Sequence, residues 1–187
     1  MQNIVKRLIV WAVIIVLILM IPLLAMQFTD EVNWSLFDFV LMGTVLFSVG
    51  LAYELVVRKS KKTMYRIAFG IGLAGAFLLF WVNGAVGIIG DSQSVNLMYG
   101  AVFAVGIIGS LVARFKPRGM ARTLFAVALT QMLVPVIALI IWPPSIISWA
   151  PSVLGVFVLN AFFAMLFVVS AVLFRHTSTH SNLIMDV

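Results

Sequence analysis

Positively charged residues occur in only four short regions of the sequence, and this distribution constrains the fold more than any other feature. They lie near the N-terminus, at positions 58–66, at positions 114–122 and at position 175. The rest of the chain is dominated by apolar stretches of about 20 residues, the length that crosses a bilayer as a helix. Hydrophobic residues make up 64% of the chain and charged residues 10%, whereas roughly a quarter of an ordinary soluble domain is charged. We therefore predict an all-α, polytopic integral membrane protein.

The apolar stretches divide the chain into six predicted helices with short polar connections. A connection of a few residues forces consecutive helices to run antiparallel, so the helices are expected to form one bundle. The predicted spans are residues 8–27, 35–57, 67–90, 97–114, 120–141 and 152–174. They form a six-helix transmembrane bundle that occupies residues 1–174 as a single domain, and residues 175–187 follow as a polar tail.

The basic residues also predict the orientation of the bundle. None occurs in the first, third or fifth connection, and Lys and Arg are enriched in cytoplasmic loops. Both termini, including the tail, are therefore expected in the cytoplasm. The basic clusters are predicted to contact anionic lipid headgroups rather than nucleic acid. The residues concerned are Arg58, Lys59, Lys61, Lys62, Arg114, Lys116 and Arg118.

The third predicted span carries a face of small residues. Gly72, Ala76, Asn83, Gly87 and Gly90 fall within about 60° of one another when the segment is wound as a helix. Small residues let membrane helices approach closely, so this helix is predicted to lie at the middle of the bundle. A second close-packing face is predicted in the fourth span at Gly106, Gly109 and Ala113.

Three side-chain amides are predicted at similar membrane depths. Asn83, Gln131 and Asn160 lie about 9, 15 and 12 Å from the outer ends of their helices by residue count. Pro135 has no N–H, so the backbone carbonyl of Gln131 also loses its helical partner. We expect these groups to converge inside the bundle. They form either hydrogen bonds that hold helices together or a site for a small polar solute, an ion or water.

Asp38 is one of two acidic residues within the predicted spans. It lies three residues after Ser35, and this spacing is typical of a capping box at a helix start. Trp34 and Phe39 are placed to form the accompanying hydrophobic staple. The alternative is a cation-gathering role at the outer mouth together with the other acidic residues there, Asp30, Glu31 and Asp91.

Glu54 is the other acidic residue. Arg58 follows one helical turn later, which favours an ion pair near the inner surface. Glu54 also shares a helical stripe with Gly43 and Gly50, so it is placed to face a neighbouring helix. The alternative role is a proton or ion site.

Several residue types that support catalysis or cofactor binding are missing. The chain has no cysteine, and no lysine or histidine falls inside a predicted span. His176 and His180 are four residues apart in the tail, but two ligands do not complete a metal site. The sequence therefore predicts no enzyme, no metal and no cofactor.

Aromatic residues near the span ends are expected to lie at the membrane–water interfaces. Trp142, Trp149 and Tyr99 are expected in the outer aromatic belt and Tyr65 in the inner one.

The segments FTDEVNWSLFDF, WVNGAVGIIG and NLMYG resemble bacterial membrane proteins, and this resemblance implies the bacterial inner membrane. Two functions stay open. The first is a non-enzymatic subunit, scaffold or accessory of a membrane assembly, formed with its own copies or with another membrane protein. The second is a small channel or transporter that uses the amides, with proton coupling through Asp38 or Glu54.

Overall fold

A computed structural model of the chain describes residues 2–30, 32–60, 62–90 and 93–182. These residues form helices joined by short connections, and no strand occurs among them. Six helical segments are long and apolar enough to cross a membrane, which confirms the predicted all-helical chain with six candidate spans. The chain divides into two compact units, residues 1–55 and 56–187, and each is described by itself. The prediction of a single domain over residues 1–174 stays a prediction.

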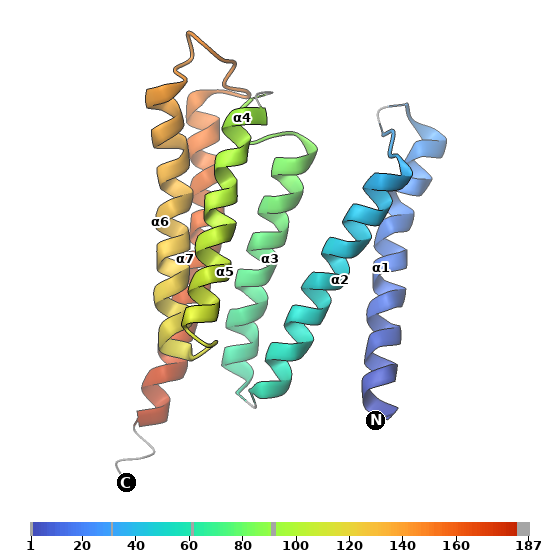
Figure 1. The fold of residues 1–187 in the computed structure, drawn as a ribbon, viewed down its shortest axis with the longest axis vertical. Helices are drawn as coiled ribbons and strands as arrows, with labels where there is room; N and C mark the ends of the chain where they lie inside the picture. Colours follow the sequence, from blue (N-terminus) through green and yellow to red (C-terminus); the bar gives the residue numbers. More distant parts are fainter. Residues whose placement is uncertain (1, 31, 61, 91–92, 183–187) are drawn as a thin grey trace. The chain divides into compact units, whose positions relative to one another are not determined.

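The first unit contains helix α1 (Gln2–Phe28) and most of helix α2 (Leu36–Lys59), drawn in blue shades in Figure 1. The two helices are in contact at Gly50 of α2, which lies against Trp11 of α1. A Cβ atom added at Gly50 would lie 2.9 Å from the indole of Trp11, so the glycine makes room for this ring. The indole also packs edge-on against Tyr53, with ring centroids 6.3 Å apart.

The second unit contains four long helical segments that run side by side (Figure 1). Helix α7 packs against α3 and α6, and α6 packs in turn against α5. Within this unit α6 and α7 are therefore the middle helices, and the prediction that the third span lies at the middle of all six helices stays a prediction. The elements are α3 (Thr63–Ala85), α4 (Gln93–Asn96), the 3-10 turn η1 (Leu97–Tyr99), α5 (Gly100–Val112), α6 (Pro117–Ile141) and α7 (Val153–Asn182).

Small residues set the helix contacts in this unit. A Cβ atom at Gly72 would lie 2.9 Å from the hydroxyl of Ser170 on α7, and that hydroxyl donates to the Ala68 carbonyl at 2.6 Å. On α5, a Cβ atom at Gly109 would lie 2.5 Å from the methyl group of Thr123 on α6. Both predicted small-residue faces are thus confirmed as close contacts, at Gly72 and at Gly109.

The C-terminal ends predicted for the third and sixth spans are wrong. Helix α3 stops at Ala85 rather than at residue 90, because Gly87 and Gly90 take left-handed backbone angles (φ +68° and +53°) that end the helix. Helix α7 continues to Asn182, so residues 175–182 of the predicted tail are helical. No glycine or proline occurs after Gly155 to stop it. The rest of the predicted tail, 183–187, lies outside the described residues.

The α3–α4 connection folds around one side chain, Asn96. Its Oδ1 accepts hydrogen bonds from the backbone N–H groups of Ile88 and Ile89, at 2.9 and 3.0 Å. Its Nδ2 donates to the Gly90 carbonyl at 3.0 Å. Ile88 and Ile89 are consequently buried. The Asn96 side chain thus supplies hydrogen bonds to the backbone of residues 88–90, which a regular helix does not supply in this segment.

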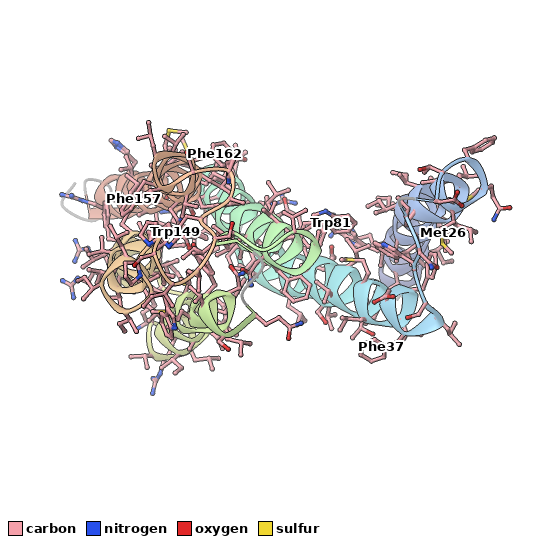
Figure 2. The ribbon with its side chains drawn as sticks, turned by 90° about the horizontal axis from the view of Figure 1, so that it is seen from above. Met26, Phe37, Trp81, Trp149, Phe157 and Phe162 are labelled. Atoms are coloured by element: carbon pink, nitrogen blue, oxygen red, sulfur yellow. The ribbon has the colours of Figure 1, made fainter. Side chains whose placement is uncertain are left out.

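The α6–α7 connection packs against the same end of the unit. Gly90 lies so close to the Ser148 carbonyl that an added Cβ atom would overlap it. Trp149 donates its indole N–H to the Trp142 carbonyl at 2.9 Å and is only 6% exposed. Figure 2 shows Trp149 within the group of helices α6 and α7. Trp149 thus packs against the chain itself, and its place in the outer aromatic belt stays a prediction. Residues 86–90 and 142–152 together form what we call the end cap.

Candidate functional site

Two of the three predicted amides meet in the core of the second unit. Gln131 on α6 donates through Nε2 to Asn160 Oδ1 on α7 at 2.8 Å. Tyr99 donates its hydroxyl to the same oxygen at 2.9 Å, and Asn160 Nδ2 donates to its own Val156 carbonyl at 2.8 Å. Tyr99, Gln131 and Asn160 are all 0% exposed. We call these three residues the buried polar cluster.

Tyr99 is the member of the cluster that sequence reasoning missed. The expectation placed it in the outer aromatic belt, because the fourth span was predicted to begin at residue 97. The helical segment begins at Gln93, which places Tyr99 about 9 Å inside the segment. This depth is close to that of the amides, and it is the signal that identifies Tyr99 as their partner.

The third predicted amide, Asn83, lies outside the cluster. Its Nδ2 donates to the Asn96 backbone carbonyl at 3.3 Å, so it binds the start of the following helical segment. Its Oδ1 is buried and accepts no hydrogen bond from the described residues. The predicted convergence of three amides is therefore confirmed for Gln131 and Asn160 and wrong for Asn83.

One acceptor of the buried polar cluster is unpaired within the described part of the chain. Gln131 Oε1 is buried and receives no hydrogen bond there. Pro135 lies inside α6, four residues after Gln131, so the Gln131 carbonyl has no N–H at the usual helical position. A buried unpaired oxygen is costly in an apolar environment. Gln131 is thus the member of the buried polar cluster that has spare acceptor capacity.

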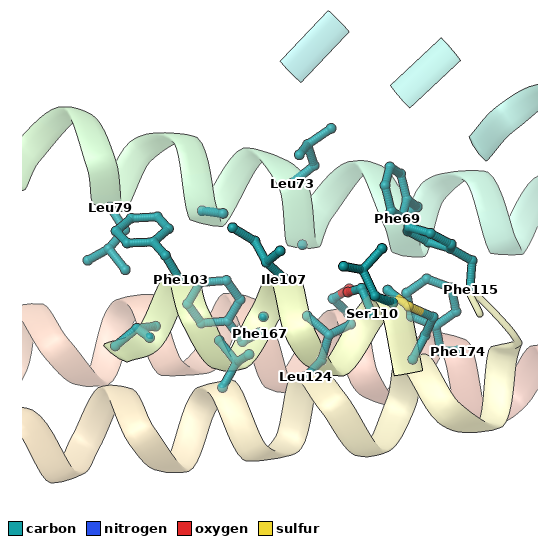
Figure 3. A pocket seen from close by; sticks show the side chains of 18 residues that line it. Phe69, Leu73, Leu79, Phe103, Ile107, Ser110, Phe115, Leu124, Phe167 and Phe174 are labelled. Atoms are coloured by element: carbon teal, nitrogen blue, oxygen red, sulfur yellow. The ribbon is translucent and has the colours of Figure 1, made fainter. Parts of the chain in front are cut away.

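The second unit also contains a cavity of about 250 Å³, which is lined by residues other than those of the cluster. Figure 3 shows side chains from α3 facing side chains from α5 across it. Helices α6 and α7 form its base. The lining is apolar except for the hydroxyls of Ser110 and Ser170, and the Ser170 hydroxyl is already bonded to α3. The cavity therefore suits a hydrocarbon ligand far better than an ion or polar solute.

Asp38 forms the predicted capping box. Its Oδ2 accepts from the backbone N–H and from the hydroxyl of Ser35, at 2.8 and 2.7 Å. The predicted staple is also present, because the rings of Trp34 and Phe39 meet edge-on with centroids 5.2 Å apart. The carboxylate thus stabilises the start of α2, where the helix dipole favours an anion.

Glu54 forms an ion pair with Arg7 of α1. Arg7 Nη1 donates to Glu54 Oε1 at 2.7 Å, and the side chain of Glu54 is only 11% exposed. Together with Gly50 and Trp11, this pair joins the two helices of the first unit. The prediction that the stripe containing Glu54 faces a neighbouring helix is confirmed. The side chain of Arg58, the predicted partner, lies outside the described residues.

The predicted headgroup-contacting residues that the structure describes lie at or beside helix ends. Lys62 precedes α3 and Lys116 precedes α6, and Arg114 and Arg118 are also exposed. Of the remaining three, Arg58 and Lys59 fall in the last turn of α2, with side chains outside the described part of the structure, and Lys61 lies outside it altogether. Their contact with lipid stays a prediction.

The described residues contain no group of three or more His, Cys, Asp or Glu side chains that could hold a metal ion. Comparisons with known protein families, with curated proteins and with solved structures find no match to this chain.

Proposed function

We propose that the chain is a non-enzymatic bacterial inner-membrane protein that acts as a subunit, scaffold or accessory of a membrane assembly. The observation that carries this proposal is the buried polar cluster. Gln131 and Tyr99 both donate to Asn160, and all three residues are fully buried. Polar groups bonded to one another in this way hold helices together, as expected of a core built for packing.

The orientation belongs to the same proposal. Lys and Arg are absent from the first, third and fifth connections, which supports a cytoplasmic location for both termini. The partner is a second copy of the chain or another membrane protein. Exposed apolar side chains on the helices supply the surface for such contacts.

A channel or transporter is the second candidate, and one specific observation favours it. Gln131 offers a buried Oε1 without a hydrogen bond from the described residues, and Pro135 leaves its carbonyl without the usual donor. Two free acceptors at one position could hold a water molecule or a small polar solute. In this function Asp38 or Glu54 would carry proton coupling, although both already bind neighbouring groups.

A flux measurement separates the two candidates. Purified chain reconstituted in liposomes is expected to pass Na⁺, K⁺, protons and water no faster than empty liposomes, because the residues of the cluster are fully buried and bonded to one another. The matched variants are Gln131→Leu, which removes the free acceptor, and Thr130→Val on the same helix, whose hydroxyl binds only its own Ala126 carbonyl. Native flux that Gln131→Leu abolishes and Thr130→Val preserves would replace the scaffold proposal with the transport one.

The assembly itself is tested by particle mass. Membranes from cells that produce the chain are extracted with a mild detergent, and the mass of the protein component is measured by light scattering. The expected mass exceeds the 20.6 kDa of one chain. A single chain that runs alone at all detergent concentrations tested would contradict the proposed role in an assembly.

A further inference from the structure

The cavity of the second unit is open to the surface along one side. Among the residues that line it, Leu79 and Val102 are at most 2% exposed, whereas Ile107 and Leu111 at its edge are 62% and 61% exposed. Helices α3 and α5 are not among the closely packed helix pairs of this unit. The cavity is thus a groove between these two helices, and it is open along the edge where Ile107 and Leu111 lie.

Aromatic contacts bound the groove at two places along its length. Phe80 of α3 meets Phe103 of α5 with ring centroids 6.4 Å apart. Phe69 of α3 meets Phe115, just after α5, with centroids also 6.4 Å apart. Figure 3 shows Phe103 toward one end of the groove, and Phe69 and Phe115 together at the other. Between these contacts Gly106 leaves the space open, since a Cβ atom added there would meet only Val127, at 3.6 Å.

The end of the groove at Phe115 carries positive charge. Arg114 and Lys116, which flank Phe115 in sequence, are both exposed, while Phe115 itself lines the groove. Arg66 lies one helical turn before Phe69 on α3. An apolar groove with cations at one end matches a molecule that has a hydrocarbon chain and an anionic head.

The backbone at this end is held in an unusual conformation. Arg114 and Phe115 both have positive φ angles, +50° and +56°, which non-glycine residues rarely adopt. Hydrogen bonds to both backbone groups of Phe115 help to hold the turn: its N–H donates to the Ser110 carbonyl at 3.2 Å, and its carbonyl accepts from the Tyr65 hydroxyl at 2.6 Å. The result is an apolar ring in the groove directly beside an exposed guanidinium. Strained residues of this kind gather at ligand-binding sites.

We propose that this groove binds one acyl chain of an anionic phospholipid, whose phosphate headgroup is held by Arg114 and Lys116. The volume of about 250 Å³ exceeds the ~150 Å³ of an apolar cavity that takes up benzene, so a segment of hydrocarbon chain fits. The apolar lining selects the chain, and the adjacent cations select the headgroup. This inference goes beyond the proposed function and does not depend on it.

Photo-crosslinking of the full chain in nanodiscs tests the site. The discs contain phosphatidylethanolamine and a small fraction of a probe lipid with a photoreactive group in the acyl chain. The probe is phosphatidylglycerol in one arm and zwitterionic phosphatidylcholine with the same acyl chain in the other. Mass spectrometry of peptides is expected to place most phosphatidylglycerol adducts on α3 and α5 residues of the groove, about five- to tenfold above phosphatidylcholine.

Paired variants separate the two parts of the site. Gly106→Leu fills the groove, since a Cβ atom there meets only Val127, at 3.6 Å, and it should reduce groove adducts to background. Gly84→Leu is the matched control, because a Cβ atom there meets nothing within 4 Å. The double variant Arg114→Gln with Lys116→Gln should bring phosphatidylglycerol labelling down to the phosphatidylcholine level. The double variant Lys6→Gln with Arg122→Gln, which removes the same charge at exposed positions outside the groove lining, should not.

A second groove-filling variant tests the groove independently, so that the conclusion does not depend on the folding of Gly106→Leu alone. Ala76→Leu fills the groove from α3, and Ala104→Leu, at an exposed position of α5 outside the groove lining, is its control. Folding of each variant is checked by gel filtration and circular dichroism. Equal labelling by the two lipids, adducts concentrated outside the groove, or labelling that both fillers leave unchanged would each overturn the proposal.

Discussion

Replacing Gly90 with alanine is expected to destabilise the folded chain by about 3 kcal/mol. The residue has a φ of +53°, and an added Cβ atom would overlap the Ser148 carbonyl. The new methyl group thus meets backbone rather than a side chain that can rotate away, so one part of the end cap must move. The free energy of unfolding is measured in mixed micelles by titration with sodium dodecyl sulfate, with helix content followed by circular dichroism.

The control for this variant is the same substitution at Gly84. That glycine lies within α3, and a Cβ atom added there would have nothing within 4 Å. Alanine favours the helix over glycine by roughly 0.5–1 kcal/mol, so Gly84→Ala should leave stability unchanged or raise it slightly. If the two variants have equal stability, the packing of residues 86–90 against residues 142–152 is not as described.

Replacing Asn160 with leucine is expected to cost about 2–4 kcal/mol. Asn160 Oδ1 accepts from both Tyr99 and Gln131, so the substitution leaves two buried donors without an acceptor. The same micelle titration measures the loss. In the double variant Asn160→Leu with Gln131→Leu one of the two stranded donors is also removed, so its loss of stability should be smaller than the sum of the two single losses.

Asn83→Leu is the matched control for the Asn160 variant. Asn83 makes one long hydrogen bond, 3.3 Å, and its Oδ1 is already without a partner among the described residues. Its replacement should cost less than about 1 kcal/mol. An effect at Asn83 as large as that at Asn160 would show that the cluster is not the main polar link in this core.

Local sequence patterns were sufficient for the number and type of the helices. Span length and hydropathy depend on consecutive residues, and the capping box at Ser35 and Asp38 depends on a spacing of three. These features need no knowledge of tertiary contacts. For the same reason the small-residue faces at Gly72 and Gly109 were predictable as close-packing surfaces.

Features that depend on long-range contacts were predicted less well. Counting residues from a helix end gives the depth of a side chain but not the direction in which it points. Asn83 and Gln131 were therefore grouped together, although Asn83 donates a hydrogen bond to the Asn96 carbonyl instead. The segment 86–90 is apolar and was predicted as helix, but Asn96 supplies a set of hydrogen bonds that stabilises a turn. The ion pair of Glu54 with Arg7 joins residues 47 positions apart, which no local spacing rule could identify.

The groove between α3 and α5 was also outside the reach of sequence reasoning. The pattern predicted that the third span would be central and closely packed. In the second unit α3 packs against α7, and α5 packs against α6. The apolar space between α3 and α5 follows from that arrangement, which depends on which faces meet rather than on which faces are small.

The central claim is that the chain crosses the membrane six times with all basic connections on one side. The most direct test of this claim is the accessibility of single cysteines. The chain has no native cysteine, so each substitution reports one position. In intact spheroplasts a membrane-impermeant maleimide is expected to label Thr29→Cys, Ser94→Cys and Ser145→Cys. Ser60→Cys, Lys116→Cys and His176→Cys should react only after the membrane is permeabilised. External labelling at any position of the second set, or protection of any position of the first, would contradict the proposed arrangement in the membrane.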